Sequence, residues 1–384
     1  MITIMTTAQQ QFLELLRAGL WGTEADPSLF PIGKTDWVSI MRIAKEQTVA
    51  LIVADGIETL PQELYPSREV MLKLMMLKVK TGQMHQLLNG TLNQIVWVLN
   101  AEETPSVLLK GQGVAQNYRN PESRSCGDID LYTGVTGYDK ACEIIERLSA
   151  KDTKPGIESD HHMHLSLNGV EVEVHRHADM MPGRKLNLSL QKWTQKSIDA
   201  YFGSDRLPKW ENNGTEISLA SPTFDAFFIL HHAVRHMTTE GVGFRQICDW
   251  IMYLHRHHAE IDTQELKKRL KEFNMELIWN EFSILAVNIL GLPAEDLPIK
   301  PASMHSSKTE KIAGHIFISG NFGRYDSNGR DHTEVPYLKR KWRSFRFQSS
   351  RLLKLFNLFP LYTTSYMWHW FTGAICKLVS GSDR

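Results

Sequence analysis

The segment LLKGQGVAQNYRNPESRSCGDIDLY, residues 108–132, decides which fold the chain can adopt. An apolar run leads to Lys110-Gly111, and a turn-rich NPESRSCG leads to the alternating run DIDLY. If DIDLY is a strand, Asp128 and Asp130 lie side by side on one face, because strand side chains two apart point the same way. Two adjacent carboxylates repel each other, so a divalent cation, a basic side chain or water must compensate them. Taken alone, this pattern is common in solvent-exposed strands.

A second polar face follows in HMHLSLNGVEVEVH, residues 162–175. Strict alternation on both sides of Asn168-Gly169 predicts a β-hairpin with a two-residue turn. In that register His164 faces Glu173, and Ser166 faces Glu171. The polar face would carry His162, His164, Ser166, Glu171, Glu173 and His175. Such alternation is typical of a half-buried strand with one solvated face, but this face can also supply a third carboxylate to the aspartate pair.

The rest of the chain is dominated by apolar residues at helical spacing. The strands do not alternate regularly with helices, so we expect an α+β fold, a small mixed sheet flanked by helices at both ends, rather than a doubly wound sheet. The predicted division is an N-terminal helical region at 1–100, an α/β core at 101–215 and a C-terminal helical region at 216–384.

Composition narrows the functional classes only slightly. The 43 basic and 43 acidic residues give a formal net charge of zero, so global charge indicates no polyanionic partner. Four scattered cysteines without a CxxC pair argue against a disulfide framework or a zinc ribbon. The N-terminus lacks a signal-peptide pattern, and no apolar run reaches the length of a membrane span. We therefore expect a cytoplasmic protein.

The order of these features resembles the nucleotidyltransferase superfamily of DNA polymerase β, and within it a bacterial group of uncharacterised nucleotidyltransferases. The resemblance is carried by four motifs and extends from about residue 10 to about residue 260. The motifs are LLKGQG, RSCGDIDLY, VEVEVH and GFRQICDW. The resemblance implies a nucleotidyltransferase core that transfers nucleotides with the help of metal ions.

Residue by residue, the resemblance implies that Asp128, Asp130 and Glu173 are catalytic carboxylates that hold Mg²⁺ or Mn²⁺. Glu171 stays open as the alternative third carboxylate. Gly111 corresponds to a glycine whose turn lets a phosphate approach, although the wider superfamily usually has Gly-Ser or Gly-Gly here. The full set that we expect to bind substrate comprises Lys110, Gly111, Arg124, Gly127, His164, His175, His236 and Arg245.

The segment FILHHAVRHM places His232 and His236 at i, i+4, a spacing that can bind a metal ion from one helix face. No glutamate completes an HExxH motif, so packing or hydrogen bonding is the simpler interpretation. The resemblance implies instead that this helix covers the active cleft, with His236, Arg245 and Asp249 near the substrate. Arg245 and Asp249 are also spaced as a structural ion pair.

Near the C-terminus, residues 338–356 have seven basic and no acidic residues, with apolar residues every three or four positions. This pattern predicts a basic amphipathic helix. We favour docking on the protein with a basic outer face, and the alternatives are peripheral contact with a membrane or with RNA. The following MWHWF, residues 367–371, is expected in the core.

The leading hypothesis is a Mg²⁺-dependent nucleotidyltransferase that transfers a nucleoside monophosphate from an NTP to an acceptor hydroxyl. The acceptor, whether protein, RNA, sugar or small molecule, is open. In this hypothesis Glu173 also acts as base for that hydroxyl. The alternative is a degenerate nucleotide-binding or interaction module of the same fold, and a third possibility is a biosynthetic role at a membrane surface.

Overall fold

A five-stranded mixed sheet carries the predicted site. The computed structural model describes residues 5–149, 157–158, 162–321 and 337–380. In the order β1-β2-β5-β4-β3, β2 pairs parallel with β5, and all other neighbours are antiparallel. The strands are β1 (Val107–Leu108), β2 (Asp128–Tyr132), β3 (Ile157–Glu158), β4 (His162–Leu167) and β5 (Val170–His175). A separate hairpin is formed by β6 (Lys209–Asn212) and β7 (Thr215–Ser218).

The β4–β5 hairpin has the predicted register. Leu167 pairs with Val170 across the turn, and His164 pairs with Glu173. Asn168 and Gly169 both adopt positive φ angles, 55° and 75°. A two-residue turn with positive φ at both positions matches the twist of the strands, which explains why Asn-Gly directs this pairing.

Most of the rest of the described chain is helical. Before the sheet lie α1 (Thr7–Trp21), α2 (Trp37–Glu46), α3 (Ala50–Ile57) and α4 (Arg68–Ala101). Within and after the sheet lie α5 (Gln112–Ala115), α6 (Gly134–Ser149), α7 (Arg184–Ser197), α8 (Pro222–Thr239) and α9 (Phe244–His257). The C-terminal part contains α10 (Thr263–Glu272), α11 (Glu276–Asn288), α12 (Thr309–Ser319), α13 (Tyr337–Leu358) and α14 (Pro360–Ser380).

Local sequence signals place several of these helix ends. Thr6 and Gln9 form a capping box at the start of α1, and Gly22 ends that helix in the left-handed region. Ser67 caps α4 directly after Pro66, and α8 has Pro222 at its first position, where no backbone N–H is needed.

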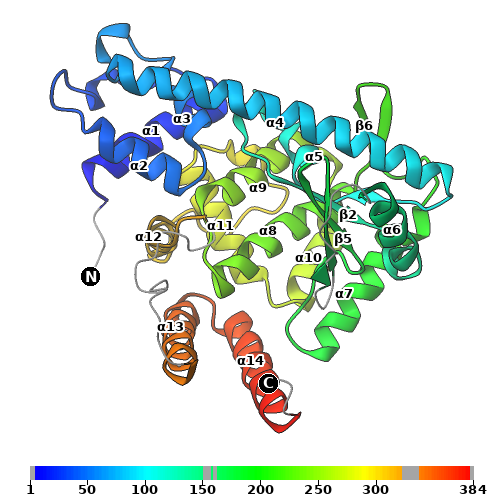
Figure 1. Ribbon diagram of the computed structural model, residues 1–384. Helices are drawn as coiled ribbons and strands as arrows, with labels where there is room; N and C mark the ends of the chain where they lie inside the picture. Colours follow the sequence, from blue (N-terminus) through cyan, green and yellow to red (C-terminus); the bar gives the residue numbers. More distant parts are fainter. Residues whose placement is uncertain (1–4, 150–156, 159–161, 322–336, 381–384) are drawn as a thin grey trace.

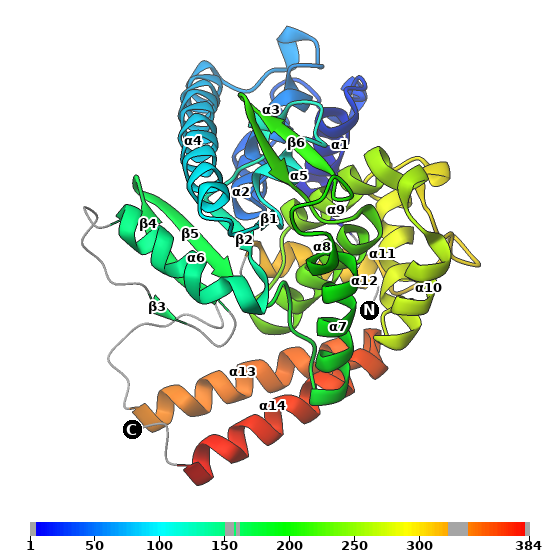
Figure 2. The same cartoon turned by 90° about the vertical axis from the view of Figure 1, so that its right-hand side faces the viewer.

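Two hydrophobic cores lie on either side of the sheet. The smaller core packs Ile129, Leu131 and the valines of β5 against α4 and α6. The larger core joins α1–α3 with α8–α12, with the end of α13 and with the start of α14. In Figures 1 and 2, α4 runs along the molecule from the N-terminal helices to the sheet, and α13 and α14 lie side by side away from it. Because the smaller core covers the apolar face of the sheet, the polar face of β2 and β5 points toward the larger helical body.

The α+β fold class is confirmed, whereas the proposed domain limits stay a prediction. One local expectation needs correction: the C-terminal aromatic run is not core, since Trp368 is 73% exposed. Gly111 leads into a single helical turn, α5. Among the described helices, none is both long and apolar enough to cross a bilayer, as the sequence predicted.

Candidate active site on the β2–β5 face

The parallel pairing of β2 and β5 brings the predicted carboxylates together. Asp128 pairs with Glu171, and Asp130 pairs with Glu173. Because the two strands run in register, all four acidic side chains start from one face of the sheet. The apolar residues between them are buried in the smaller core on the other face, as the alternation predicted.

Asp130 is the buried centre of this face, with 1% of its surface exposed. Its Oδ1 atom lies 2.9 Å from Lys110 Nζ and 3.0 Å from His175 Nε2. Its Oδ2 atom is also buried but has no hydrogen-bond partner among the described residues. One carboxylate oxygen is thus compensated by the protein, and the other is available to a further positive group.

The pKa values of Lys110 and Glu173 are shifted so that both groups are charged at neutral pH. Burial lowers the pKa of Lys110, but the charges of Asp130, Asp128 and Glu173 outweigh it and raise that pKa. Burial raises the pKa of Glu173, but the hydrogen bond from His175 and the charge of Lys110 bring it down to about 2. Glu173 is therefore ionised at neutral pH, beside a protonated Lys110.

His175 completes the charged cluster. Burial lowers its pKa, but hydrogen bonds to Asp130 and Glu173 reverse that effect and raise it. His162, by contrast, has a pKa of about 4, because burial outweighs the charge of Glu173. One histidine of this face thus favours the charged form and the other the neutral form.

Among the residues that the structure describes, two overlapping groups of donor atoms have the spacing needed to hold a metal ion. They consist of Asp130, Glu173 and His175, and of His162, His164 and Glu173, with the atoms of each group within 4.8 Å of one another. Glu173 is common to both. Asp128, the exposed Glu171 and the exposed Gly127 lie on or beside the same face but belong to neither group. His164 bridges the glutamates, with Nδ1 3.1 Å from Glu171 Oε1 and 3.3 Å from Glu173 Oε1.

Gly111 lies in the turn between β1 and α5. Its φ of 63° and ψ of −118° are unfavourable for any residue with a side chain. A Cβ atom here would also lie 3.3 Å from the carbonyl oxygen of Asp128. The glycine thus lets the turn that carries Lys110 approach β2 closely, which places Lys110 Nζ on Asp130.

Arg124, predicted to bind substrate, forms an ion pair with a residue of another element. Its guanidinium is buried and bidentate on Asp249 of α9, with distances of 2.9 Å from Nε to Oδ1 and 2.7 Å from Nη2 to Oδ2. Tyr118 donates to the same carboxylate at 2.7 Å. Asp249 therefore pairs across the fold with Arg124, and the charge of Arg245, one helical turn away, also lowers the pKa of Asp249. Arg124 ties the loop before β2 to α9.

Helix α8 lies over the Lys110 side of the site. His232 and His236 contact each other through Nε2 atoms 2.9 Å apart. Burial lowers the pKa of both, and the charge of Lys110 lowers each further. A small cavity of about 30 Å³ is lined by Lys110, His232 and Asp249 among others. Arg245 donates from Nη1 to the carbonyl of Ser125 at 3.1 Å, so it also contacts the loop before β2.

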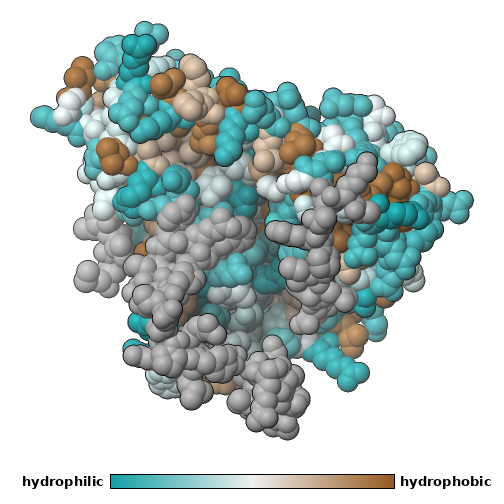
Figure 3. Space-filling view, viewed as in Figure 1, coloured by the Kyte–Doolittle hydropathy of each residue, from teal (hydrophilic) through white to brown (hydrophobic). Residues whose placement is uncertain are grey.

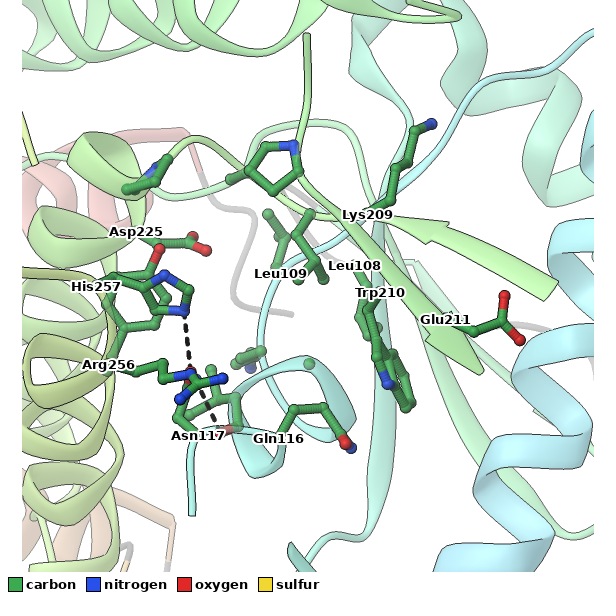
Figure 4. A pocket seen from close by; sticks show the side chains of 18 residues that line it. Leu108, Leu109, Gln116, Asn117, Lys209, Trp210, Glu211, Asp225, Arg256 and His257 are labelled. Atoms are coloured by element: carbon green, nitrogen blue, oxygen red, sulfur yellow. Dashed lines mark hydrogen bonds between the residues drawn. The ribbon is translucent and has the colours of Figure 1, made fainter. Parts of the chain in front are cut away.

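A larger cavity of about 290 Å³ adjoins Lys110 on the other side of α5, between α8–α9 and β6. Figure 4 shows Asp225 and Arg256 reaching into it from the helices, opposite Trp210. His257 closes one wall through a 3.0 Å contact with Asn117.

In the view of Figure 3, the middle of the molecular surface is hydrophilic and hollowed.

Sequence reasoning missed two parts of this neighbourhood. His162 was placed on the polar face but not among the site residues, and only the sheet register brings it beside Glu173. The β6–β7 hairpin, which lines the larger cavity, was not predicted, although Asn213-Gly214 gave the same signal as Asn168-Gly169.

A comparison with protein-family models matches residues 33–291, more than half of the chain, to a family described as uncharacterised nucleotidyltransferase. No curated protein and no solved structure matches the chain. The matched range includes the Lys110-Gly111 turn, both aspartates, the hairpin with Glu173, and Asp249. By this match the chain belongs to the uncharacterised nucleotidyltransferase family.

Proposed function

We propose that the β2–β5 face is the active site of a nucleotidyltransferase that transfers a nucleoside monophosphate from an NTP to an acceptor hydroxyl with Mg²⁺ or Mn²⁺. The observation that carries the proposal is the register of β2 and β5, which places Asp130 beside Glu173 and next to Lys110. Three ionisable side chains from three separate segments converge here.

The residues present fit a divalent cation. Asp130 keeps a buried oxygen without a partner in the described structure, and Glu173 is ionised. Carboxylate oxygens are the ligands that Mg²⁺ and Mn²⁺ prefer, and the adjacent imidazoles also suit Mn²⁺. Asp130, Glu173 and Asp128 would hold the cation, which would polarise the phosphoryl oxygens and lower the pKa of the acceptor hydroxyl.

Side chains around the cation site would contact the phosphate and orient the carboxylates. Lys110 is positively charged and only partly exposed, so it can steady a phosphate oxygen while it stays on Asp130. His175 donates to the carboxylates and fixes their orientation. Gly111 keeps the Lys110 turn against β2. With a pKa of about 2, Glu173 is better suited to ligation than to accepting a proton, which weighs against its proposed role as base.

The structure favours Glu173 over Glu171 as the third carboxylate. Glu173 belongs to both donor groups, whereas the side chain of Glu171 is 59% exposed. Two matched variants test this: Glu173→Gln, which removes one charge beside Asp130, and Glu171→Gln, which removes one charge two residues away. Mn²⁺ binding, measured by electron paramagnetic resonance, should weaken at least tenfold in the first and remain within about twofold in the second.

The reaction itself is tested with each of four labelled NTPs, Mg²⁺ or Mn²⁺, and cell extract. The wild-type chain should label an acceptor, and the variant carrying Asp128→Asn and Asp130→Asn should not, while its circular dichroism stays unchanged. Label transfer that persists in this double variant would contradict the proposal.

A second candidate is a degenerate nucleotide-binding module. It is favoured by the contacts of Lys110 and His175 with Asp130 Oδ1, since the buried charge is already partly neutralised without a metal ion. Calorimetry separates the two functions: the enzyme predicts NTP binding that depends on Mg²⁺, and a titration without Mg²⁺-dependent NTP binding would favour the module.

A further inference from the structure

The C-terminal helices α13 and α14 form a pair with an unusual charge distribution. Across residues 337–380 the sequence contains no Asp or Glu. Its basic residues are Lys339, Arg340, Lys341, Arg343, Arg346, Arg351, Lys354 and Lys377. The whole chain has a formal net charge of zero, so this pair concentrates positive charge that acidic residues balance elsewhere.

One face of α13 attaches the pair to the body. Leu352 and Leu355 are buried, with 0% and 1% of their surface exposed. Gln348 donates to the carbonyl of Thr238 at 2.7 Å, and Arg351 donates to the carbonyl of Thr239, both at the end of α8. The docked orientation of α13 is therefore defined by packing and by hydrogen bonds.

A second face of α13 is apolar and exposed. Trp342, Phe345, Leu353 and Phe356 are separated by three, eight and three residues, which places them on one side of a helix. Their exposed fractions are 60%, 39%, 60% and 43%. On α14, Leu361, Trp368 and Phe371 are also exposed, and Phe345 lies against Trp370 and Phe371. These residues together are called the apolar stripe below.

A third face of α13 is basic. A cavity of about 400 Å³ lies between α12 and α13, and none of the described residues that line it is acidic. It is lined by His315, Ile318, Ser319, Arg343, Arg346, Phe347, Ser350, Arg351 and Lys354. Burial lowers the pKa of His315, and the charges of Lys354 and Arg351 lower it further, as expected beside a concentration of positive charge.

We propose that the α13–α14 pair binds the surface of an anionic phospholipid bilayer, with the apolar stripe at the headgroup–acyl boundary and the basic cavity on lipid phosphates. A helix with Trp, Phe and Leu on one face and Lys and Arg on the adjacent face lies in the plane of a membrane interface. Tryptophan prefers that depth, and each basic residue near an anionic leaflet adds to binding.

The geometry favours lipid over single-stranded RNA, which also binds basic and aromatic surfaces. RNA bases stack on free aromatic faces. Here three of the rings stack on one another: Trp342 on Phe345 at 5.7 Å, and Phe345 on Trp370 at 5.3 Å between centroids. Leu353 and Leu361 offer no ring at all, but they gain from contact with acyl chains.

Vesicle flotation of the full chain tests the proposal. The protein should float with vesicles that contain phosphatidylglycerol, should float much less with phosphatidylcholine alone, and should be released partly by high salt. The double variant Arg343→Glu with Arg346→Glu should partition at least about twentyfold more weakly, since each basic residue contributes about fivefold. Its matched control is Lys267→Glu with Lys271→Glu on α10, which changes the same net charge on exposed residues and should bind like the wild type.

The apolar stripe is tested separately. Trp342→Ser with Trp368→Ser should abolish the blue shift of tryptophan emission that vesicles cause and should weaken flotation even at low salt. Trp97→Ser removes a similarly exposed tryptophan, 70% exposed, from α4 and should change neither. Thermal melting of each variant shows that it is folded.

Three outcomes would overturn the proposal. The first is no flotation with phosphatidylglycerol vesicles. The second is an equal loss of binding in the α10 control. The third is binding of labelled single-stranded RNA or of inorganic phosphate, abolished by the Arg343 and Arg346 changes, while vesicles do not bind.

Discussion

Asp130 holds Lys110 and His175 on one oxygen and leaves its other oxygen without a partner among the described residues. A buried carboxylate without Lys110 would be costly, so the lysine accounts for part of its stability. The remaining oxygen marks where a further positive group can bind. The aspartate pair is thus compensated first by the protein itself.

Arg124, predicted from a motif to bind substrate, also has a structural contact. Its guanidinium forms an ion pair with Asp249, and Tyr118 donates a hydrogen bond to the same carboxylate. The pair fixes the loop that leads into β2, so Arg124 acts on the site by positioning it. The sequence could not show this, because the two residues are far apart along the chain.

Asp225 gives a prediction on pH. It is 5% exposed, its Oδ1 has no partner in the described part of the chain, and burial raises its pKa well above the usual value. A carboxyl group whose pKa is higher in the folded than in the unfolded state stabilises the fold at pH values below its pKa in the unfolded state. This stabilisation is lost as the pH rises through its pKa in the folded state. The variant Asp225→Asn should therefore gain stability over wild type as pH rises from 4 to 8.

The gain should exceed about 1 kcal/mol at neutral pH, because each pH unit of linked proton uptake is worth about 1.4 kcal/mol. Urea unfolding at several pH values measures it. A difference that stays constant with pH would mean that Asp225 is ionised in the folded state.

Among the elements, the β1–α5 turn depends most on one residue. Gly111→Ala should destabilise the protein by about 1–3 kcal/mol, because alanine is strained at this positive φ and its Cβ would press on Asp128. It should also impair label transfer by moving Lys110 away from Asp130. Gly90→Ala on α4 is the control: its Cβ meets nothing within 4 Å, and it should stabilise by up to about 1 kcal/mol. Thermal melting distinguishes them, and equal effects would show that the turn is not constrained.

At the scale of the whole molecule, the larger core joins the two ends of the chain. Leu355 of α13 belongs to the same core as the residues of α1 and α8. Leu355→Ala should destabilise the fold by about 2–5 kcal/mol in one cooperative transition, since it opens a cavity in a shared core. Leu353→Ala, two residues away and 60% exposed, should change stability by less than about 0.5 kcal/mol. Two separate unfolding transitions would show that the C-terminal pair is independent of the body.

The sequence by itself determined the features that depend on local order. Alternation predicted both faces of β2, Asn168-Gly169 set the hairpin register, and the motif order identified the family, because backbone period and turn conformation are local properties. Only the tertiary structure decided that Lys110 and His175 both contact Asp130 and that Arg124 pairs with Asp249. It also decided that Trp368 and Phe371 are exposed. Those contacts depend on how distant segments pack, and packing is set by the competition of all buried surfaces rather than by any one stretch of sequence.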